Sequence, residues 1–346
     1  MNLETQIKTE KILVDSLFQN SISAGRIEAF KNWEIHRLTG DASSRRYYRV
    51  DCEKKQFVVC LQQPLEGGGR DNFVDMQRIL SSENIRVPHI YDVDLERGYL
   101  LEEDLGDQTL LNFLSKLRSP REELEAYEKA LQELIKINGI KKESYPEGCF
   151  SSLYFDKEKL MSEVAFTVKQ LIEGLFNQAL SEEKKKILET TFENICQTLA
   201  SQKMVVTHRD YHSRNIMIKD SDFVVIDFQD ARMGIPQYDL VSLLEDCYYK
   251  ISRQNKHKLK KTYWDEFLKE KCYQSSFEEF SILYDKMAIQ RIFKALGSFA
   301  YIYRLRGDIR YLKYIGYAFE KLRDILFRYK EYNELRVVLS EIYYEY

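Results

Sequence analysis

The segment at residues 205–228, VVTHRDYHSRNIMIKDSDFVVIDF, combines two short apolar stretches with a polar loop between them. Asp210 and Asn215 lie in the loop, and Asp227 directly follows the apolar run at 223–226. Apolar runs of this length indicate short strands, so the three polar side chains stand at strand ends. Two carboxylates and one amide at this spacing can hold Mg²⁺ on a nucleotide and orient a hydroxyl group for attack on its γ-phosphate. The segment therefore predicts a phosphoryl-transfer site.

Each residue of this segment has its own expected role. Asp210 can accept the proton of an incoming hydroxyl and aim its oxygen at phosphorus, which matters more in phosphoryl transfer than a strong base does. Asn215 offers a neutral oxygen and Asp227 an anionic one, and Mg²⁺ prefers such hard ligands. A lone aspartate is more often a cap or turn residue, but the joint spacing favours function. Structural roles are expected for Arg209, as an ion-pair partner, and for Asp239, as a helix cap or a loop brace.

The composition is that of a globular protein with a sizeable core. The 346 residues are 44% hydrophobic and 31% charged, with a net charge of −3. This balance does not favour nucleic acid or an anionic membrane as a partner. The polar N-terminal residues do not resemble a signal peptide, and no apolar run approaches the roughly 18 residues of a spanning helix, so we expect a cytoplasmic protein. None of the six cysteines forms a CxxC pair, so we expect reduced, buried thiols and no zinc.

The first third of the chain has the pattern of a small mixed lobe. Apolar residues recur at near-helical spacing over 4–19 and over 71–82. Five short strands with one inserted helix predict an α+β lobe. The expected strands are 33–38, 47–51, 57–61, 90–94 and 99–102.

Past Gly106 the periodicity becomes mainly helical. No linker rich in Pro, Gly or Ser separates the two parts, so we expect lobes in close contact, at residues 1–105 and 106–346, with a cleft for a ligand between them. The Tyr and Phe residues at 293–319 are expected mostly in the core. The expected helices are 108–117, 121–138, 157–178, 181–201, 239–252, 258–272, 276–304, 309–329 and 331–345.

The stretches HRDYHSRNIMI at 208–218 and VVIDFQDARMGIPQYDLVSLL at 224–244 resemble the aminoglycoside phosphotransferase-like kinases. LTGDASSRRYYRV at 38–50, DLERGYLLEEDLGDQTLLNFL at 94–114 and FQDA at 228–231 extend the likeness. Within that group they are most similar to the anomeric amino-sugar kinases of bacterial cell-wall recycling. The resemblance covers roughly residues 35–250. It implies a two-lobed protein-kinase-like fold, with a small N-terminal lobe on an antiparallel sheet and a large, mainly helical C-terminal lobe.

The resemblance also implies roles for individual residues. Asp210 is the expected catalytic base, Asn215 and Asp227 are the expected magnesium ligands, and ATP and Mg²⁺ are the expected cofactors. The loop at 40–46 is expected to lie over the nucleotide phosphates, where hydroxyl and backbone N–H groups take the place of missing glycines. The stretch at 101–105 is expected to form the hinge beside the adenine. The implied nucleotide-binding residues are Ser43, Ser44, Arg45, Arg46, Glu102 and Asp104.

One residue of the kinase pattern is missing. Kinases of this fold usually carry a lysine on the third strand that holds the α- and β-phosphates. Here the strand reads FVVCLQQP at 57–64, with no lysine at residues 60–62. The amino-sugar kinases also tend to lack it, so the gap fits the resemblance. Arg45 and Arg46 are the expected sources of the missing charge, with Arg70 as a further candidate.

The residues and the resemblance together predict a small-molecule kinase, with an N-acetylated amino sugar as the expected acceptor at its C1 hydroxyl. An anomeric hydroxyl is more acidic than an ordinary sugar hydroxyl, so a modest base such as Asp210 suffices. One alternative is a kinase for an aminoglycoside, choline or another sugar, with Glu245 and Asp246 as candidate acids for a cation. The other is a nucleotide-binding regulator without turnover, which the missing lysine motivates.

Overall fold

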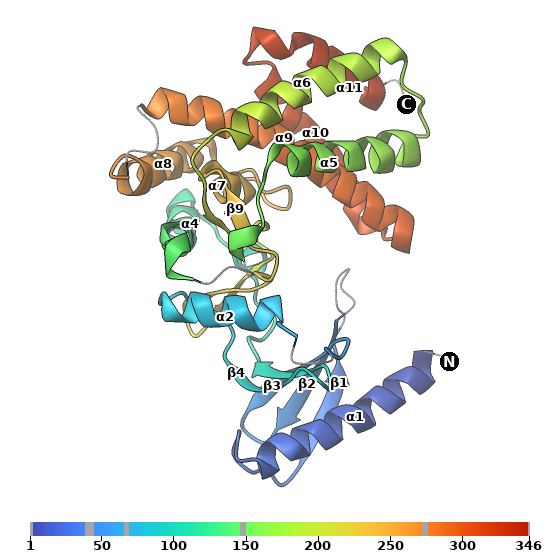
Figure 1. Ribbon diagram of the computed structural model, residues 1–346, viewed down its shortest axis with the longest axis vertical. Coiled ribbons are helices and arrows are strands. Elements are labelled where there is room, and N and C mark those ends of the chain that lie inside the picture. Colours follow the sequence, from blue (N-terminus) through green and yellow to red (C-terminus); the bar gives the residue numbers. More distant parts are fainter. Residues whose placement is uncertain (1–2, 39–44, 66–68, 146–149, 272–275, 345–346) are drawn as a thin grey trace.

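The computed structural model describes residues 3–38, 45–65, 69–145, 150–271 and 276–344. The chain forms a small lobe built on a sheet and a larger, mainly helical lobe, which follow one another along the long axis of the molecule (Figure 1). This confirms the α+β class and the two-lobed arrangement expected from the sequence. The position of the boundary between the lobes, at Gly106, stays a prediction.

The small lobe is a five-stranded antiparallel sheet with the strand order β1-β2-β3-β5-β4. Helix α1, Leu3–Ser23, packs on one face of it, where the ring of Phe18 meets those of Trp33 and Phe57 edge to face. Burying these large aromatic side chains gives the small lobe a core of its own. The strands are β1 Trp33–Arg37, β2 Arg46–Cys52, β3 Gln56–Leu61, β4 Ile90–Asp94 and β5 Tyr99–Glu103.

The side chains of strand β2 alternate between the core of the small lobe and a cavity on the other face of the sheet. Successive side chains of a strand point to opposite faces. Tyr48 and Val50 are fully buried in the core shared with α1, whereas Tyr47 and Arg49 line a cavity on the other face. The alternation along this one strand therefore decides which residues can reach a bound molecule.

Helix α2, Asn72–Ser82, lies between the sheet and the large lobe (Figure 1). Asp71 caps its first turn by accepting a hydrogen bond from the backbone N–H of Phe73 at 2.9 Å. The ring of Phe73 stacks on that of Phe228 with centroids 4.8 Å apart. This contact ties the small lobe to the segment of the large lobe that carries Asp227.

Two short antiparallel pairs form the floor between the lobes, β6 with β9 and β7 with β8. Lys219, at the end of β7, donates hydrogen bonds to Glu103 Oε1 at 2.9 Å and to the backbone oxygen of Asp104 at 2.7 Å. The end of the sheet is therefore anchored to the floor. The strands are β6 Val205–Thr207, β7 Ile216–Lys219, β8 Asp222–Val225 and β9 Arg232–Gly234.

The large lobe is built around α9, Phe277–Arg306, a helix of 30 residues that packs against α5, α7 and α10. The approach of α5 requires a glycine, because a Cβ on Gly297 would lie 2.5 Å from Thr167 Oγ1. The other α-helices are α3 Leu110–Leu114, α4 Pro120–Gly139, α5 Lys157–Thr167, α6 Glu182–Ala200, α7 Gln237–Leu244, α8 Arg253–Tyr263, α10 Leu312–Leu326 and α11 Asn333–Tyr344. Short π- or 3₁₀-helical segments are η1 Lys142–Ser144, η2 Phe150–Ser152, η3 Val168–Leu175, η4 Trp264–Leu268, η5 Ile309–Tyr311 and η6 Lys330–Tyr332.

The strands and most helices expected from the sequence are present, with two instructive differences. The helix expected at 239–252 ends at Leu244, because the carboxylate of Asp246 accepts hydrogen bonds from the backbone N–H groups of Ser213, at 3.0 Å, and Tyr248, at 2.7 Å. These bonds offer the backbone an alternative to helix. Strand β9 was not expected, because its three residues are too few to show a period.

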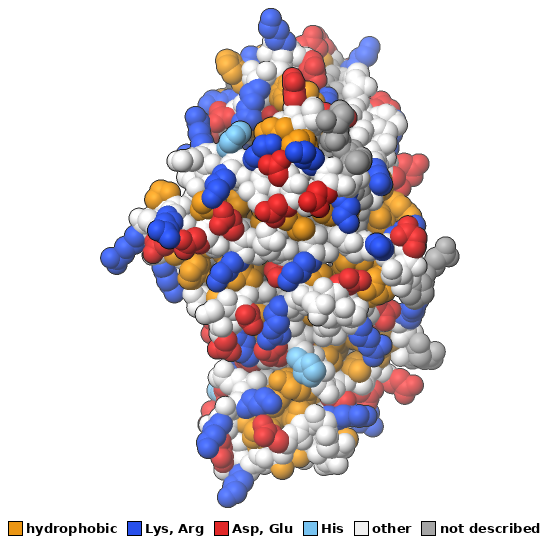
Figure 2. Space-filling view, turned by 90° about the vertical axis from the view of Figure 1, so that its left-hand side faces the viewer, with side chains coloured by type: hydrophobic (Ala, Val, Ile, Leu, Met, Phe, Trp, Pro, Cys, Tyr) orange, Lys and Arg blue, Asp and Glu red, His pale blue; other side chains and the backbone are white. Residues whose placement is uncertain are grey.

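The helices, the surface charges and the cysteines can each be compared with what the composition indicates. In the described part of the chain, no helix is long and apolar enough to cross a membrane. Figure 2 shows Lys and Arg interspersed with Asp and Glu over one face of the molecule, in line with the small net charge. Cys149 and Cys272 lie outside the described residues. Four cysteines are buried free thiols, as expected: Cys52, Cys60, Cys196 and Cys247.

Candidate active site

The loop that carries Asp210 is braced by a buried carboxylate of α7. Asp239 accepts hydrogen bonds from the backbone N–H groups of His208, at 2.6 Å, and Arg209, at 3.0 Å. Arg209 has a left-handed backbone with φ of +84°, which costs a residue with a Cβ about 1–2 kcal/mol and needs such support. His208 Nε2 lies 2.9 Å from the backbone oxygen of Ile226, which joins the loop to the segment after β8. Of the two roles expected for Asp239, the structure shows the loop brace.

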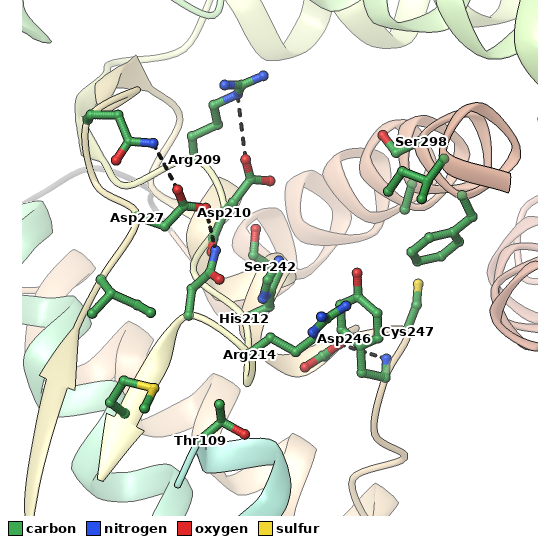
Figure 3. A pocket seen from close by; sticks show the side chains of 18 of the residues that line it. Thr109, Arg209, Asp210, His212, Arg214, Asp227, Ser242, Asp246, Cys247 and Ser298 are labelled. Carbon is green, nitrogen blue, oxygen red and sulfur yellow. Dashed lines mark hydrogen bonds and ion pairs between the residues drawn. The ribbon is translucent and has the colours of Figure 1, made fainter. Parts of the chain in front are cut away.

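Asn215 lies next to Asp227, which Figure 3 shows together with Asp210 among the side chains that line the cavity. Asn215 Nδ2 donates hydrogen bonds to Asp227 Oδ2 and to the backbone oxygen of Asp210, both at 3.0 Å. Because the amide nitrogen of Asn215 is engaged, its oxygen is left to face a cation. Asp227 itself has a left-handed backbone, with φ of +65°. One amide oxygen and one carboxylate fit Mg²⁺, which takes its remaining ligands from phosphates and water.

Three cations surround the carboxylate of Asp210. Arg291 Nη2 and Lys294 Nζ, both from α9, each donate to Asp210 Oδ1 at 3.1 Å. Arg209 Nε lies 3.7 Å from Oδ2. Burial alone would raise the pKa of Asp210, but the positive charges of Lys294 and Arg291 outweigh it and hold the pKa well below its usual value. Asp210 is therefore ionised at neutral pH, and Oδ2 is the oxygen left to meet a hydroxyl group.

A cavity of about 1030 Å³ opens between the two lobes. Clefts at such boundaries are common ligand sites, and this volume lies at the upper end of their range. Asp210, Asn215 and Asp227 all line it, so the structure brings the three residues singled out by the sequence to one space. Its other walls come from β2, β5, α5, α7 and α9 and include Tyr47, Glu102, Phe166, Ser242 and Ser298.

The expected hinge lines the cavity on the side of the sheet. Burial raises the pKa of Glu102 to about 7. Asp104 forms an ion pair with Arg49 and accepts a hydrogen bond from the backbone N–H of Gly106 at 2.6 Å. The side chain of Asp104 thus fixes the turn after β5. The structure places both residues at the cavity, and their contact with a nucleotide stays a prediction.

The two arginines at the start of β2 lie on opposite faces of the sheet. Arg45 Nη2 lies 3.5 Å from Asp71 Oδ2, and the guanidinium group covers the ring of Phe73, which lines the cavity. Arg46 Nε lies 2.8 Å from Glu10 Oε1 of α1. Arg46 is therefore turned to the core face and is not brought to the cavity with the other expected nucleotide ligands, because neighbouring residues of a strand point in opposite directions.

Of residues 60–62, where no lysine stands, Gln62 contacts the cap of α2. Gln62 Nε2 donates to Asp71 Oδ2 at 2.8 Å, so the cap of α2 holds both Gln62 and Arg45. Arg70 Nε lies 3.4 Å from Asp75 Oδ2, and its side chain is largely exposed. Ser43 and Ser44 lie outside the described residues. None of the three arginines considered for the phosphates is among the described residues that line the cavity, but Arg45 covers Phe73, which does line it.

The acids expected to bind a cationic acceptor already have partners. Glu245 accepts hydrogen bonds from Lys256 at 2.9 Å and from the hydroxyl of Tyr284 at 3.0 Å. Asp246 accepts the backbone bonds that end α7. Near them, the guanidinium of Arg214 covers the ring of Tyr248 at 5.0 Å. This end of the cavity therefore presents compensated acids and a cation.

A family model described as the phosphotransferase enzyme family matches residues 34–271, more than half of the chain. The chain belongs to this family. The matched range contains Asp210, Asn215 and Asp227, which the structure brings together. The protein is a phosphotransferase, a kinase.

This phosphotransferase is similar to curated N-acetylmuramate/N-acetylglucosamine kinases. It is 26% identical to the one from Neisseria meningitidis serogroup B (strain MC58) over 314 residues, which cover 90% of this chain and 91% of the relative. It is 29% identical to the one from Pseudomonas aeruginosa (strain PAO1) over 314 residues, which cover 89% of this chain and 88% of the relative.

Solved structures share the fold of this phosphotransferase. One is an ADP-bound aminoglycoside phosphotransferase, APH(2'')-Ib, with a TM-score of 0.56 and 18% identity over 95% of this chain and 98% of the other. Another is the choline kinase LicA from Streptococcus pneumoniae, with a TM-score of 0.57 and 16% identity over 91% of this chain and 99% of the other. The protein-kinase-like fold implied by the resemblance is confirmed.

Sequence reasoning missed the two cations that α9 brings to Asp210. Arg291 and Lys294 follow it by more than 80 positions and lie beyond the range of the family match. The signal in the sequence was faint: an arginine and a lysine three positions apart in AIQRIFKALG at 288–297, an otherwise apolar stretch. In a buried helix such cations need acidic partners, which only the fold supplies.

Proposed function

We propose that this phosphotransferase transfers the γ-phosphoryl group of ATP, with Mg²⁺, to the C1 hydroxyl of N-acetylmuramate or N-acetylglucosamine. Such an activity would serve the recycling of cell-wall sugars. The names of the curated relatives support these acceptor sugars, and their likeness extends over about 90% of the chain. The site is built from Asp210, Asn215 and Asp227.

The part of the cavity lined by Glu245, Asp246 and Arg214 is called the acceptor end. Its charge favours some small alcohols over others as the acceptor. A choline or aminoglycoside site needs acids or aromatic faces open to a cation. Here Glu245 is held by Lys256 and Tyr284, and Asp246 is held by backbone N–H groups. Arg214 and Lys294 also line the cavity and add positive charge to it. A neutral or anionic acceptor fits this end better, and of the two proposed sugars N-acetylmuramate bears a carboxylate.

In the proposed reaction Asp210 Oδ2 accepts a hydrogen bond from the C1 hydroxyl and aims its oxygen at the γ-phosphorus. The proton passes to Asp210 as the new O–P bond forms and the bond to the β-phosphate oxygen breaks. With its pKa held low, Asp210 is a weak base, and it suffices because the transition state is loose and the anomeric hydroxyl is acidic for an alcohol. Asp239 keeps the loop in the required position through His208 and Arg209.

The nucleotide would lie on the side of the sheet. Asn215 and Asp227 would hold Mg²⁺, which when bound neutralises charge on the phosphates. Arg45 would approach the phosphates from the start of β2, and the hinge at 101–105 would lie beside the adenine. The fold supports these placements, and each can be tested by mutation.

A panel assay tests the proposal. The protein is incubated with ATP and Mg²⁺ and, in separate reactions, with N-acetylmuramate, N-acetylglucosamine, glucose, choline and an aminoglycoside, and ADP release is followed. Asp210→Asn serves as the inactive control. We expect ADP release with the two N-acetylated sugars and little with the cationic alcohols.

The product then distinguishes the hydroxyl groups. A C1 phosphate is a glycosyl phosphate and is hydrolysed in warm dilute acid, whereas a phosphate on another hydroxyl survives. Turnover only with choline or an aminoglycoside would reject the acceptor, and no turnover with any alcohol would favour a nucleotide-binding regulator.

A further inference from the structure

We propose that Lys294 is a catalytic residue, whose ammonium group contacts the transferred phosphoryl group while it holds Asp210, and that Arg291 is a positioning residue for Asp210. The inference rests on phosphoryl transfer at Asp210, as in the proposed function, but not on which alcohol accepts the phosphate. Both residues belong to α9, which lies beyond residues 34–271, the range that the family model matches.

Arg291 and Lys294 both line the cavity and are both largely buried, but their contacts differ. Arg291 is bonded on two sides, to Ser242 Oγ through Nε and to Asp210 Oδ1 through Nη2, and its guanidinium covers the ring of Tyr238. These contacts hold the side chain of Asp210 in place. Among the described residues, Lys294 Nζ has one hydrogen-bond partner, Asp210 Oδ1 at 3.1 Å, and the side chain lines the cavity. An ammonium group has three donors, so two of them remain for a ligand.

A purely structural role explains Lys294 poorly. Its side chain is only 13% exposed, and burial lowers the pKa of its ammonium group against the attraction of Asp210. Arg291 already donates a hydrogen bond to the same carboxylate oxygen, Asp210 Oδ1, at the same distance of 3.1 Å. A second buried cation there adds desolvation cost and repulsion to the fold. Costly buried charges that face a cavity are typical of functional sites.

The reaction needs positive charge at this place. The third-strand lysine is absent, and Arg46 and Arg70 are paired with Glu10 and Asp75 away from Asp210. In the transfer step negative charge is spread over the equatorial oxygens of the phosphoryl group. A cation fixed beside the base, in a partly water-excluded cavity, stabilises that charge without reorganisation. Lys294 stays protonated throughout, and the proton of the acceptor goes to Asp210 Oδ2.

The test compares Lys294→Met and Lys294→Arg with the control Lys286→Met. Lys286 is on the same helix, where it bonds to the hydroxyl of Tyr332 at 2.7 Å and lies outside the cavity. The acceptor is N-acetylglucosamine, or the alcohol that the parent protein phosphorylates in the panel if it rejects this sugar. The measured quantities are kcat, KM for ATP and for the acceptor, and the Kd of ADP.

For Lys294→Met we expect kcat to fall about 100-fold or more, with both KM values and the Kd of ADP within about 3-fold of the parent. Lys294→Arg is expected to recover at least about 10-fold of that loss, and Lys286→Met to keep the parental kcat. A Lys294→Met protein that keeps kcat within about 5-fold, or loses only affinity, would overturn the proposal.

Chemical rescue keeps the proposal testable if the methionine variant does not fold. Lys294→Ala is assayed with increasing ethylammonium chloride, and choline chloride at equal ionic strength serves as the salt control. A saturable rise of kcat with ethylammonium alone is expected, because the small cation can replace the missing ammonium group. Failure of rescue in a Lys294→Ala protein that binds ADP normally would contradict catalysis by Lys294. The proposed function would fail separately, by absence of sugar phosphorylation in the parent.

Discussion

The side-chain amide of Asn215 donates a hydrogen bond to Asp227 Oδ2 across 3.0 Å, so the two proposed metal ligands are in direct contact. This bond predicts that the pair acts as a unit. Asp227→Asn keeps the shape of the side chain but removes its charge, so we expect kcat to fall about 100-fold or more with the fold intact. Steady-state assays over a Mg²⁺ titration, with the melting temperature as control, check this. Parental kcat at saturating Mg²⁺ would exclude Asp227 as a metal ligand.

Arg45 and Arg46 form a natural matched pair, because they are neighbours in sequence but lie on opposite faces of the sheet. Arg45→Ala is expected to weaken ADP binding about 10-fold, since one charge-assisted contact to a phosphate contributes about 1.5–3 kcal/mol. Arg46→Ala is expected to leave ADP affinity unchanged and to lower stability by at most about 1 kcal/mol, through loss of the pair with Glu10. Calorimetric titration with ADP measures the affinities. Equal losses of ADP affinity in the two variants would contradict a phosphate contact that is specific to Arg45.

Arg214 is expected to recognise the carboxylate of N-acetylmuramate, because its guanidinium is held at the acceptor end by Tyr248 and by the hydroxyl of Tyr311 at 3.1 Å. Arg214→Met should lower kcat/KM about 10-fold or more for N-acetylmuramate and change it less than about 3-fold for N-acetylglucosamine, which lacks the carboxylate. Arg310→Met, at a largely exposed position, is the control. A similar loss for both sugars would assign Arg214 a structural role instead.

Burial raises the pKa of Glu102 to about 7, while the nearby Arg45 opposes the shift and Asp71 adds to it. A group with a raised pKa in the folded state stabilises the fold fully below its ordinary value of 4.5, and this stability is lost as pH rises through 7. Glu102→Gln stays neutral, so it should gain on the order of 2 kcal/mol relative to the parent between pH 5 and pH 8. Urea unfolding at several pH values measures the difference. If the difference in free energy of unfolding between the two proteins does not change with pH, then the pKa of Glu102 is not raised by folding, which would contradict this account.

Local pattern was enough to single out three residues that the structure brings to one cavity. Asp210, Asn215 and Asp227 stand next to short strands, and strands fix the backbone on which such residues sit. The alternation of β2 was also visible in principle, since Tyr48 and Val50 belong to a buried row. Which face of β2 would meet α1 was not visible, because that depends on packing between elements far apart in the chain. For this reason Arg46 was expected beside the phosphates and is found beside Glu10.

Long-range partners were beyond the reach of sequence reasoning. The electrostatics of Asp210 depend on Arg291 and Lys294, and the charge of Glu245 is compensated by Lys256. Ion pairs of this kind have no spacing rule, since they arise where separate helices meet. Glu245 was thus a candidate for binding a cation in the sequence, and in the fold it is a buried, satisfied acid.

The position of the phosphate on the product tests the central claim most directly. N-acetylmuramate and N-acetylglucosamine, each uniformly labelled with ¹³C, are incubated with the protein, ATP and Mg²⁺, and the ¹³C spectrum is recorded before any acid treatment. We predict that the C1 resonance of at least one sugar becomes split by coupling to phosphorus and that Asp210→Asn leaves both spectra unchanged. Phosphorus splitting of other carbons without splitting of C1, or unsplit spectra with active protein on a different alcohol, would contradict an anomeric sugar kinase.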